Sequence, residues 1–317
     1  MTKALGIWMT TILWLGANSG LSPASLGFRK ISDHFFYLES KTETANTGAL
    51  ITAEGVLLID PPTEAEILVM LASLKTITSR PVRWIVFTDY EQARNGGTAG
   101  LLKQGAAFIA SKELDRLMTA SSVADPARAA SFALTRPNPR FLFGRQMHLF
   151  PAGIEVRIMA VNGKARTAGD VFVFLPAEKV LYVGKFFTPG SFPQIDGIPG
   201  EGTAPGWIDG LKQVVESVPL LKSAMPQPKP DPTIPREPEK SLEETIAVVA
   251  AHGAPATLMQ LKSLLAAAQK LRADGAKAIA AGRSQEEFVK SISPEVISEF
   301  ANAEAFAAQL YIDLARK

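Results

Sequence analysis

The order of strand-like and helix-like segments between residues 31 and 110 constrains the fold more than any other feature of this chain. β-Branched and aromatic residues mark the strands, and apolar residues three and four positions apart mark the helices. In order, the segments are strands at 31–39 and 48–51, two strands within 51–60, a helix at 63–78, a strand at 83–87, a helix at 96–103 and a strand at 106–110. This alternation predicts a layered α/β domain, in which helices cover the faces of a sheet.

A second group of strands and a helical end complete the chain. The expected elements are a loop-rich stretch near 121–140, strands at 145–149, 154–161, 170–175 and 180–183, and helices at 205–217, 256–281, 284–291 and 294–316. Ser284 and Glu287 have the spacing of a capping box, and Ser293-Pro294 is typical of a helix start. Six prolines within 226–239 exclude a helix there and disfavour a strand, so we expect an extended surface loop.

Composition excludes several classes of function. The chain has 317 residues, of which 47% are hydrophobic, so it can build a large core without covalent support. It contains no cysteine, which excludes disulfides, thiolate zinc sites, iron–sulfur clusters and cysteine nucleophiles. The formal net charge of +2 argues against a nucleic-acid partner. The three histidines, His34, His148 and His252, are too few for a histidine-rich catalytic metal centre.

Residues 1–24 have the features of a secretory signal. A single Lys precedes the apolar run of residues 4–17, and small residues up to Ser19 and Ala24 fit a cleavage rule. The run is short for a membrane span, although an uncleaved N-terminal anchor is the alternative. We therefore expect export to the periplasm or the cell exterior, cleavage after Ser19 or Ala24, and a mature chain, 25–317, that forms one domain without a membrane span.

Four segments, taken in order, resemble the motifs of one large family. They are ITAEGVLLID (51–60), RPVRWIVFTDYEQARNGG (80–97), NGKARTAGDVFVFLPAEKVLYVGK (162–185) and VVAAHGAP (248–255). The chain resembles the metallo-β-lactamase fold superfamily, whose usual motifs are T-H-x-H-x-D-H-x-G-G, G-x-A-H-T-x-G-D, G-D and G-H-G-x-P. The resemblance implies a four-layer αββα sandwich with a helical C-terminal portion, and a zinc-binding hydrolytic centre.

The resemblance fails at the metal-ligand positions. In the frame of the family these positions hold Asp89, Glu91, Ala93, Arg94, Arg166 and Lys185. An Arg side chain has no lone pair to give a cation, and a Lys is protonated at neutral pH. Three cations against two carboxylates leave a net charge of +1. The resemblance therefore implies a salt-bridge cluster in a former metal-site cleft with no bound metal, whereas ordinary surface charges in loops are the alternative.

Three further residues belong to this frame. The resemblance implies that Asp60 and Asp170 orient the side chains at the metal-ligand positions. Pro61-Pro62, which follows Asp60, departs from the usual pattern of the family. His252 matches the histidine of the late G-H-G loop. Alternatively, a helix that begins at a Ser241–Glu244 capping box could end near His252, and Pro228 would then occupy the loop position. His34 and His148 match no ligand position and are expected to be structural.

These observations favour a pseudoenzyme, a metallo-β-lactamase-like protein without metal-dependent hydrolysis that binds a small anionic molecule in the old cleft. Two alternatives stay open. The chain could be a hydrolase with a rearranged site, in which Asp89, Glu91 and His252 hold one metal or Asp89 and Glu91 act as an acid/base pair. It could instead bind a partner protein through its helical C-terminal portion, 256–317.

Overall fold

The computed structural model describes residues 27–40, 45–90, 97–124, 140–195, 201–220 and 245–316. The expected signal segment, 1–24, and the proline-rich segment, 226–239, lie outside these ranges. None of the described helices is both long and apolar enough to cross a membrane.

The first sheet has seven strands in chain order. They are β1 (Arg29–Lys30), β2 (Phe35–Leu38), β3 (Thr47–Ile51), β4 (Val56–Ile59), β5 (Val82–Val86), β6 (Ala107–Ser111) and β7 (Arg140–Phe143). β1 to β4 form an antiparallel meander, whereas β4 to β7 run parallel to one another. All four residues of β4 are buried, as expected of a central strand that is covered on both faces.

The second sheet has six strands in the order β13-β12-β11-β10-β9-β8. They are β8 (Gln146–Leu149), β9 (Val156–Ala160), β10 (Val171–Leu175), β11 (Val180–Gly184), β12 (Ala247–Ala250) and β13 (Ala256–Thr257). β8 to β11 are antiparallel neighbours, and β12 pairs parallel with β11. A short 3-10 helix, Pro151–Gly153, joins β8 to β9.

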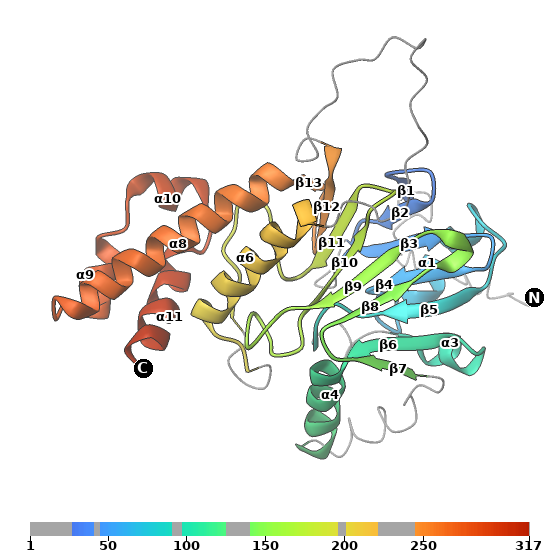
Figure 1. Ribbon diagram of the computed structural model, residues 1–317, viewed down its shortest axis with the longest axis horizontal. Helices are drawn as coiled ribbons and strands as arrows, with labels where there is room; N and C mark the ends of the chain where they lie inside the picture. The colour runs from blue at the N-terminus through green and yellow to red at the C-terminus, as the bar shows by residue number, and fades with distance from the viewer. Residues whose placement is uncertain are drawn as a thin grey trace, which may run out of the picture.

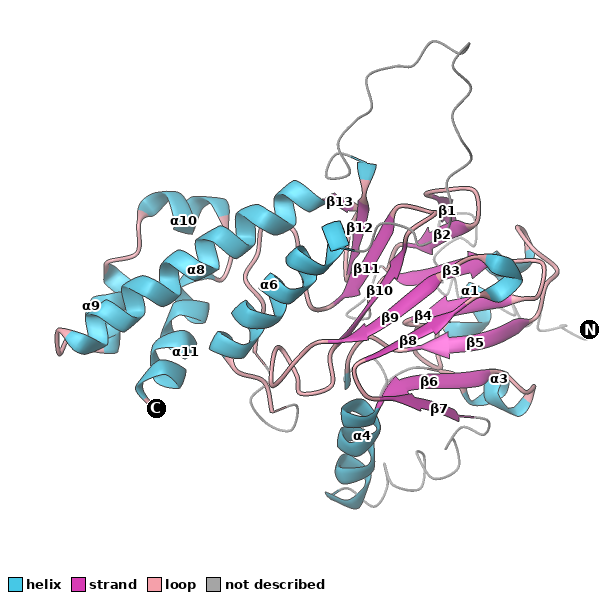
Figure 2. Ribbon diagram, in the orientation of Figure 1, coloured by secondary structure: helices cyan, strands magenta, loops and turns pink. Residues whose placement is uncertain are grey.

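Helices form the two outer layers. They are α1 (Ile67–Lys75), α3 (Ala99–Lys103), α4 (Lys112–Ala124), α6 (Ala204–Leu220), α8 (Leu258–Ala280), α9 (Gln285–Lys290), α10 (Pro294–Glu299) and α11 (Ala303–Ala315). In Figure 1, α6 lies beside the second sheet, α8 runs from β13 past α6 and away from the sheet, and α9, α10 and α11 gather at the C-terminal end. Figure 2 separates the magenta strands of the two central layers from the cyan helices that flank them.

Three apolar clusters hold the four layers together. One joins α1, α3 and α4 to the outer face of the first sheet, and a second joins α6, α8 and α11 to the outer face of the second sheet. The third lies between the sheets, where Leu57 and Ile59 of β4 face Val173 of β10 and Tyr182 of β11. Side chains alternate along β4, so Val56 and Leu58 face the outer helices, whereas Leu57 and Ile59 face the other sheet. The αββα sandwich expected from the sequence is therefore confirmed.

The C-terminal third differs from the expectation in one place. A single helix was expected over 294–316, but the chain forms α10 and α11 with a break at residues 300–302. The break exists because this segment pairs with another part of the chain: the Phe192 N–H donates to the Ala301 carbonyl, and the Ala301 N–H donates to the Gly190 carbonyl. Asn302 then takes a left-handed φ of 61° before α11 starts. The capping box at Ser284 is present as expected.

The helix α4 and the strand β7 were not predicted from the sequence. α4 and β7 border the stretch near 121–140 that was expected to be loop, and residues 125–139 between them lie outside the described part of the chain. α4 carries Thr, Ser and Asp among its apolar residues, which obscures the helical pattern. It nevertheless buries Leu114, Leu117 and Met118 against the first sheet.

Candidate functional site

The ends of strands from both sheets converge at one edge of the sandwich. β4, β5 and β6 run parallel, so the residues after their C-terminal ends, including Asp60 and Thr88, emerge on the same side. The backbone N–H of Val171, which opens β10 in the second sheet, donates to the Thr88 carbonyl at 2.7 Å. A Cβ atom added to Gly184, the last residue of β11, would lie 2.1 Å from Thr88 Oγ1. We call this region the edge site; it comprises residues 60, 88–89, 166–170 and 184–185.

Asp60 and Thr88 form a buried pair at the centre of the edge site. Asp60 accepts from the Thr88 backbone N–H at 2.8 Å and from the Thr88 hydroxyl at 2.5 Å, and its side chain is fully buried. Asp60 also has a φ of 50°, a left-handed conformation that non-glycine residues rarely adopt. The Thr47 hydroxyl donates to the Asp60 carbonyl at 2.9 Å and holds this strained turn in place. Strain of this kind is found preferentially at functional sites.

Asp170 and Thr167 repeat the same arrangement in the second sheet. Asp170 accepts from the Thr167 backbone N–H at 2.7 Å and from the Thr167 hydroxyl at 2.6 Å. Both side chains are buried. Each aspartate thus fixes the backbone of a loop that carries a candidate site residue, Asp89 after Thr88 and Arg166 before Thr167. The loops are therefore held rigidly at the edge site.

Arg166 enters the edge site from a tightly packed loop. Its side chain is only 8% exposed. The Thr203 backbone N–H donates to the Ala165 carbonyl at 2.8 Å, and a Cβ on Gly202 would lie 1.9 Å from the Arg166 carbonyl oxygen. Only glycine fits at position 202, because any side chain there would overlap the Arg166 carbonyl group. The segment before α6 thus locks the loop that carries this guanidinium group.

Electrostatic effects show which side chains of the edge site act on one another. The pKa of Asp60 is raised to about 7, because burial and then the nearby Asp89 carboxylate raise it by more than the Thr88 hydrogen bonds lower it. The pKa of Asp170 is also raised to about 7, because burial raises it by more than the Thr167 hydrogen bonds and the Arg166 guanidinium lower it. Asp89 adds a smaller upward effect on Asp170. Asp60, Asp89, Arg166 and Asp170 therefore form one electrostatic group.

The segment that carries His252 lies in a turn directly after β12, so residues 247–250, which the alternative interpretation placed in a helix, form a strand; its capping box at 241–244 lies outside the described residues. Asn46 holds this turn. Its backbone N–H donates to the Ala251 carbonyl at 2.6 Å, and its side-chain amide donates to the Ala250 and Gly253 carbonyls, each at 3.0 Å. Because Ala250 pairs with Gly184, the turn stands beside the end of β11, where the half-buried Lys185 follows.

Tyr182 connects this turn to the buried carboxylates. Its hydroxyl donates to the Asn46 carbonyl, and its ring is packed between the two sheets. Burial raises the pKa of Tyr182 well above its ordinary value, and the nearby Asp60 carboxylate adds to the rise. Sequence reasoning missed both Asn46 and Tyr182. Neither belongs to a motif, and their roles arise from pairing between strands that are distant in the sequence.

The structure therefore brings together some of the predicted site residues. Asp60, Asp89, Arg166 and Asp170 share the edge site, and Lys185 follows its Gly184. Glu91, Ala93 and Arg94 lie outside the described residues. The two other histidines contact carboxylates elsewhere: His34 Nδ1 is 2.9 Å from Glu178 Oε1, and His148 Nδ1 is 3.2 Å from Glu155 Oε1.

The donor set at the described ligand positions does not fit a dinuclear zinc centre. Such a centre takes neutral imidazoles and carboxylates, but two of the four described positions carry Arg166 and Lys185, and the others carry Asp89 and His252. Within the described ranges, no three His, Asp or Glu side chains are grouped so that they could hold a metal ion. We derive no chemical step through a metal for this chain.

Comparison with solved structures identifies the fold. A metallo-β-lactamase from Pontibacter korlensis is 19% identical and superposes with a TM-score of 0.57, over 77% of this chain and 99% of that chain. The chain has the metallo-β-lactamase fold. FIM-1, a metallo-β-lactamase of Pseudomonas aeruginosa solved in its mono-zinc form, is 17% identical with a TM-score of 0.55, over 77% of this chain and 95% of its own.

A larger relative covers more of the chain. The stereoselective inverting sec-alkylsulfatase Pisa1 from Pseudomonas sp. is 14% identical, with a TM-score of 0.65 over 92% of this chain. This chain spans only 50% of the length of that alkylsulfatase. No family model matches the sequence, and no curated protein sequence matches it significantly. The likeness thus rests on structure, and at these identities it shows the fold alone.

Proposed function

We propose that this protein is a metallo-β-lactamase-fold pseudoenzyme that binds a small anionic molecule at the edge site without a metal ion. The observation that carries the proposal is the position of Arg166. In the motif of the family this position belongs to a histidine ligand, and here it holds a guanidinium group that is 8% exposed. A guanidinium cannot lose its proton in a protein, so it repels a dication that would bind beside it.

Charge at the edge site supports an anionic ligand. At the described ligand positions Arg166 and Lys185 are the cations and Asp89 is the carboxylate. The edge site therefore has a net charge of +1 when buried Asp60 and Asp170 are protonated, which their pKa of about 7 favours below neutral pH. Glu91 and Arg94, at the positions the motif predicts, would add opposite charges and leave this sum unchanged. An arginine presents a planar pair of donors that matches a carboxylate or phosphate in a bidentate contact. A carboxylate-bearing small molecule is therefore the expected ligand class.

The rigid frame around Arg166 also favours binding. The backbone is fixed on both sides of Arg166. Thr167 donates two hydrogen bonds to Asp170, and Gly202 packs directly against the Arg166 carbonyl. A fixed donor loses little conformational entropy when it binds, which increases affinity. The same rigidity also prevents the loop from moving aside to admit a metal ion.

The proposal is tested by titrating the purified protein with succinate and with inorganic phosphate in a calorimeter. We expect saturable binding of one or both anions that weakens at least tenfold in Arg166→Gln. The matched control is Arg116→Gln, because Arg116 is an exposed arginine that pairs with Glu113 and Glu201. The control should bind like the unmodified protein. Equal affinity in all three proteins, or no binding of either anion, would refute the anion site.

The two alternative functions predict different results in the same experiments. A single-metal hydrolase that uses Asp89, Glu91 and His252 would bind a divalent metal, and His252→Ala would abolish that binding. A partner-binding protein would act through the helical end, where the exposed large apolar side chains among the described residues are Met259 and Ile297. A stable protein interface usually needs about 20–30 residues on each side, so these two side chains give that alternative little support.

A further inference from the structure

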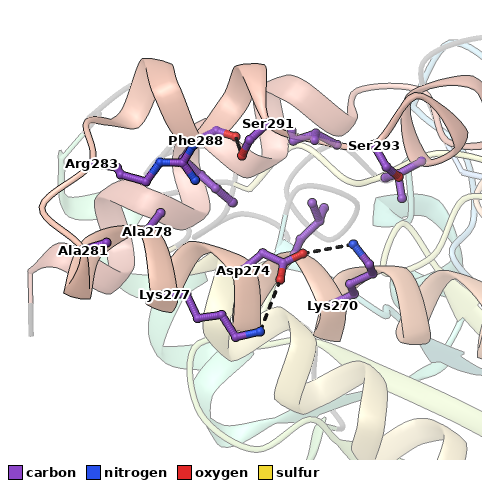
Figure 3. A pocket seen from close by; sticks show the side chains of 12 residues that line it. Lys270, Asp274, Lys277, Ala278, Ala281, Arg283, Phe288, Ser291 and Ser293 are labelled. Carbon is purple, nitrogen blue, oxygen red and sulfur yellow. Dashed lines mark hydrogen bonds and ion pairs between the residues drawn. The ribbon is translucent and has the colours of Figure 1, made fainter.

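The helical end of the molecule contains a cavity of about 360 Å³ between α8 and the α9–α10 segment (Figure 3). Its apolar wall is formed by Leu271 and Ala278 of α8, Phe288 of α9, and Ile292 and Val296. Phe288 is 1% exposed, and its ring lies 6.0 Å from that of Tyr311 in α11. The wall is therefore a stable part of the helical core.

Charged side chains surround the mouth of this cavity. Lys270 and Lys277 lie 3.0 Å and 3.9 Å from the two carboxylate oxygens of Asp274, and Figure 3 shows both ion pairs. Arg283 extends from the end of α8 toward Phe288 in the same view. Three cations and one carboxylate leave a net charge of +2 at the mouth. Apolar and positively charged surfaces thus meet within one cavity.

We propose that this cavity, which we call the helical pocket, binds a small amphiphilic anion with a carboxylate or sulfate head and a short alkyl chain. The head would lie among Lys270, Lys277 and Arg283, and the chain would lie along Phe288 and its apolar neighbours. The volume lies near the lower end of the range of about 300–1,000 Å³ that is usual for ligand pockets, so the ligand is small. This site is separate from the edge site and does not depend on its function.

Charge and chain length distinguish this ligand from other occupants. A purely apolar molecule would make no contact with the three cations, of which Lys270 and Lys277 share the single carboxylate of Asp274. An inorganic anion would contact the lysines, but it would leave the apolar wall exposed to water. Only a molecule with an anionic head and an alkyl chain contacts both the cations and the apolar wall. Octanoate and octyl sulfate are therefore the probes of choice, and octanol, acetate and inorganic sulfate are the comparison compounds.

The test is calorimetric titration of the full chain with each compound. We expect octanoate or octyl sulfate to bind with one-to-one stoichiometry, at least tenfold more tightly than octanol, acetate or sulfate. Arg283→Gln should weaken the binding about tenfold, as expected for the loss of one charge-assisted contact. If octanoate and octyl sulfate bind with equal affinity, the pocket recognises a negative charge joined to an alkyl chain. If one of them binds at least tenfold more tightly, its head group, carboxylate or sulfate, is the one that the pocket prefers.

A matched pair of variants locates the binding. Ala281 lines the pocket and is exposed, so Ala281→Trp should fill the mouth and abolish binding without disturbing the core. Ala280 is also exposed but does not line the pocket, so Ala280→Trp should bind normally. Arg166→Gln at the edge site should also leave this binding unchanged. Unchanged affinity in Ala281→Trp, or octanol binding as tightly as octanoate, would overturn the proposal.

Discussion

Thr88 donates both its backbone N–H and its hydroxyl to the carboxylate of Asp60, at 2.8 Å and 2.5 Å. This pair connects the end of β4 to the end of β5, and the Val171 N–H then connects Thr88 to the second sheet. The edge site is therefore built on a hydrogen-bonded frame that needs no metal ion to hold it together. Each residue of the frame can be removed singly, which makes its contribution measurable.

Replacement of Thr88 by Val tests the frame directly. The change keeps the shape of the side chain but removes the hydroxyl that donates to buried Asp60 Oδ2. We expect the free energy of unfolding to fall by about 1–3 kcal/mol, the usual cost of leaving a buried polar atom without its donor. Urea denaturation measures this loss. Thr76→Val is the control, because exposed Thr76 donates to the Ser73 carbonyl and water can replace that bond; its effect should stay within about 0.5 kcal/mol.

Gly184 tests the contact between the two sheets. Gly184→Ala combines a left-handed φ of 52° with a new Cβ that would lie 2.1 Å from Thr88 Oγ1 and 2.8 Å from Asp60 Oδ2. Gly190 has a similar φ of 67°, but its nearest neighbour would be 3.8 Å away. Gly190→Ala should cost about 1–2 kcal/mol from backbone strain alone, and Gly184→Ala about 1–3 kcal/mol more from overpacking. Equal losses in the two variants would contradict the close approach.

The raised pKa values of Asp60 and Asp170 predict a pH-dependent stability. Between the ordinary Asp pKa near 3.9 and a folded-state pKa of about 7, each carboxyl holds a proton in the folded state that it loses on unfolding. The free energy of unfolding should therefore decrease as the pH rises from about 4 to about 7. Urea denaturation at several pH values across this window measures the slope.

Variants assign that slope to the buried carboxyls. Asp60→Asn should reduce the slope, because the amide does not titrate and the Thr88 hydroxyl can turn to accept from it. Asp33→Asn should leave the slope unchanged, because the exposed Asp33 pairs with Lys30 and its pKa is lowered, so it titrates below the window. A pH-independent stability in the unmodified protein between pH 4 and 7 would be incompatible with these pKa values.

The coupling between Arg166 and Asp170 is accessible to a double-mutant cycle. Above about pH 8, where Asp170 is ionised, Arg166→Ala leaves a buried carboxylate without its nearby cation and should cost about 3 kcal/mol. Asp170→Asn in the same chain should recover part of that loss, with an interaction energy of about 0.5–3 kcal/mol. The exposed pair of Arg116 and Glu201 is the control cycle and should give under about 1 kcal/mol. Additive losses at Arg166 and Asp170 would show that the guanidinium does not act on that carboxyl.

The fold was largely predictable because local patterns and motif order agree. The strand at residues 56–59, the helix at 67–75 and the strand at 82–86 appear where apolar spacing placed them. At Gly184 and Gly202 a side chain would overlap atoms of the edge site, so both positions require glycine. Such constraints remain visible in a sequence, because only one residue type satisfies them.

The parts that were missed depend on contacts between distant segments. The break between the helices α10 and α11 exists because Ala301 pairs with residues 190–192, and no residue pattern near Asn302 predicts this pairing. The strand at 247–250 was not predicted: one interpretation placed these residues in a helix and the other placed them before the late loop, and pairing with the parallel strand β11 decides the outcome. Asn46 and Tyr182 acquire their roles in the same way. A single sequence contains little information on such pairing.

The zinc content of the purified full-length chain tests the central claim most directly. The protein would be produced in zinc-supplemented medium, dialysed against metal-free buffer and analysed by elemental mass spectrometry, and its melting temperature would be measured with and without added zinc. Because a ligand at one hundred times its Kd adds about 2.7 kcal/mol of stability, real binding would shift the melting temperature visibly. We predict well under one equivalent of zinc and no shift. One or more equivalents that survive dialysis and raise the melting temperature would contradict the account and establish a metal centre.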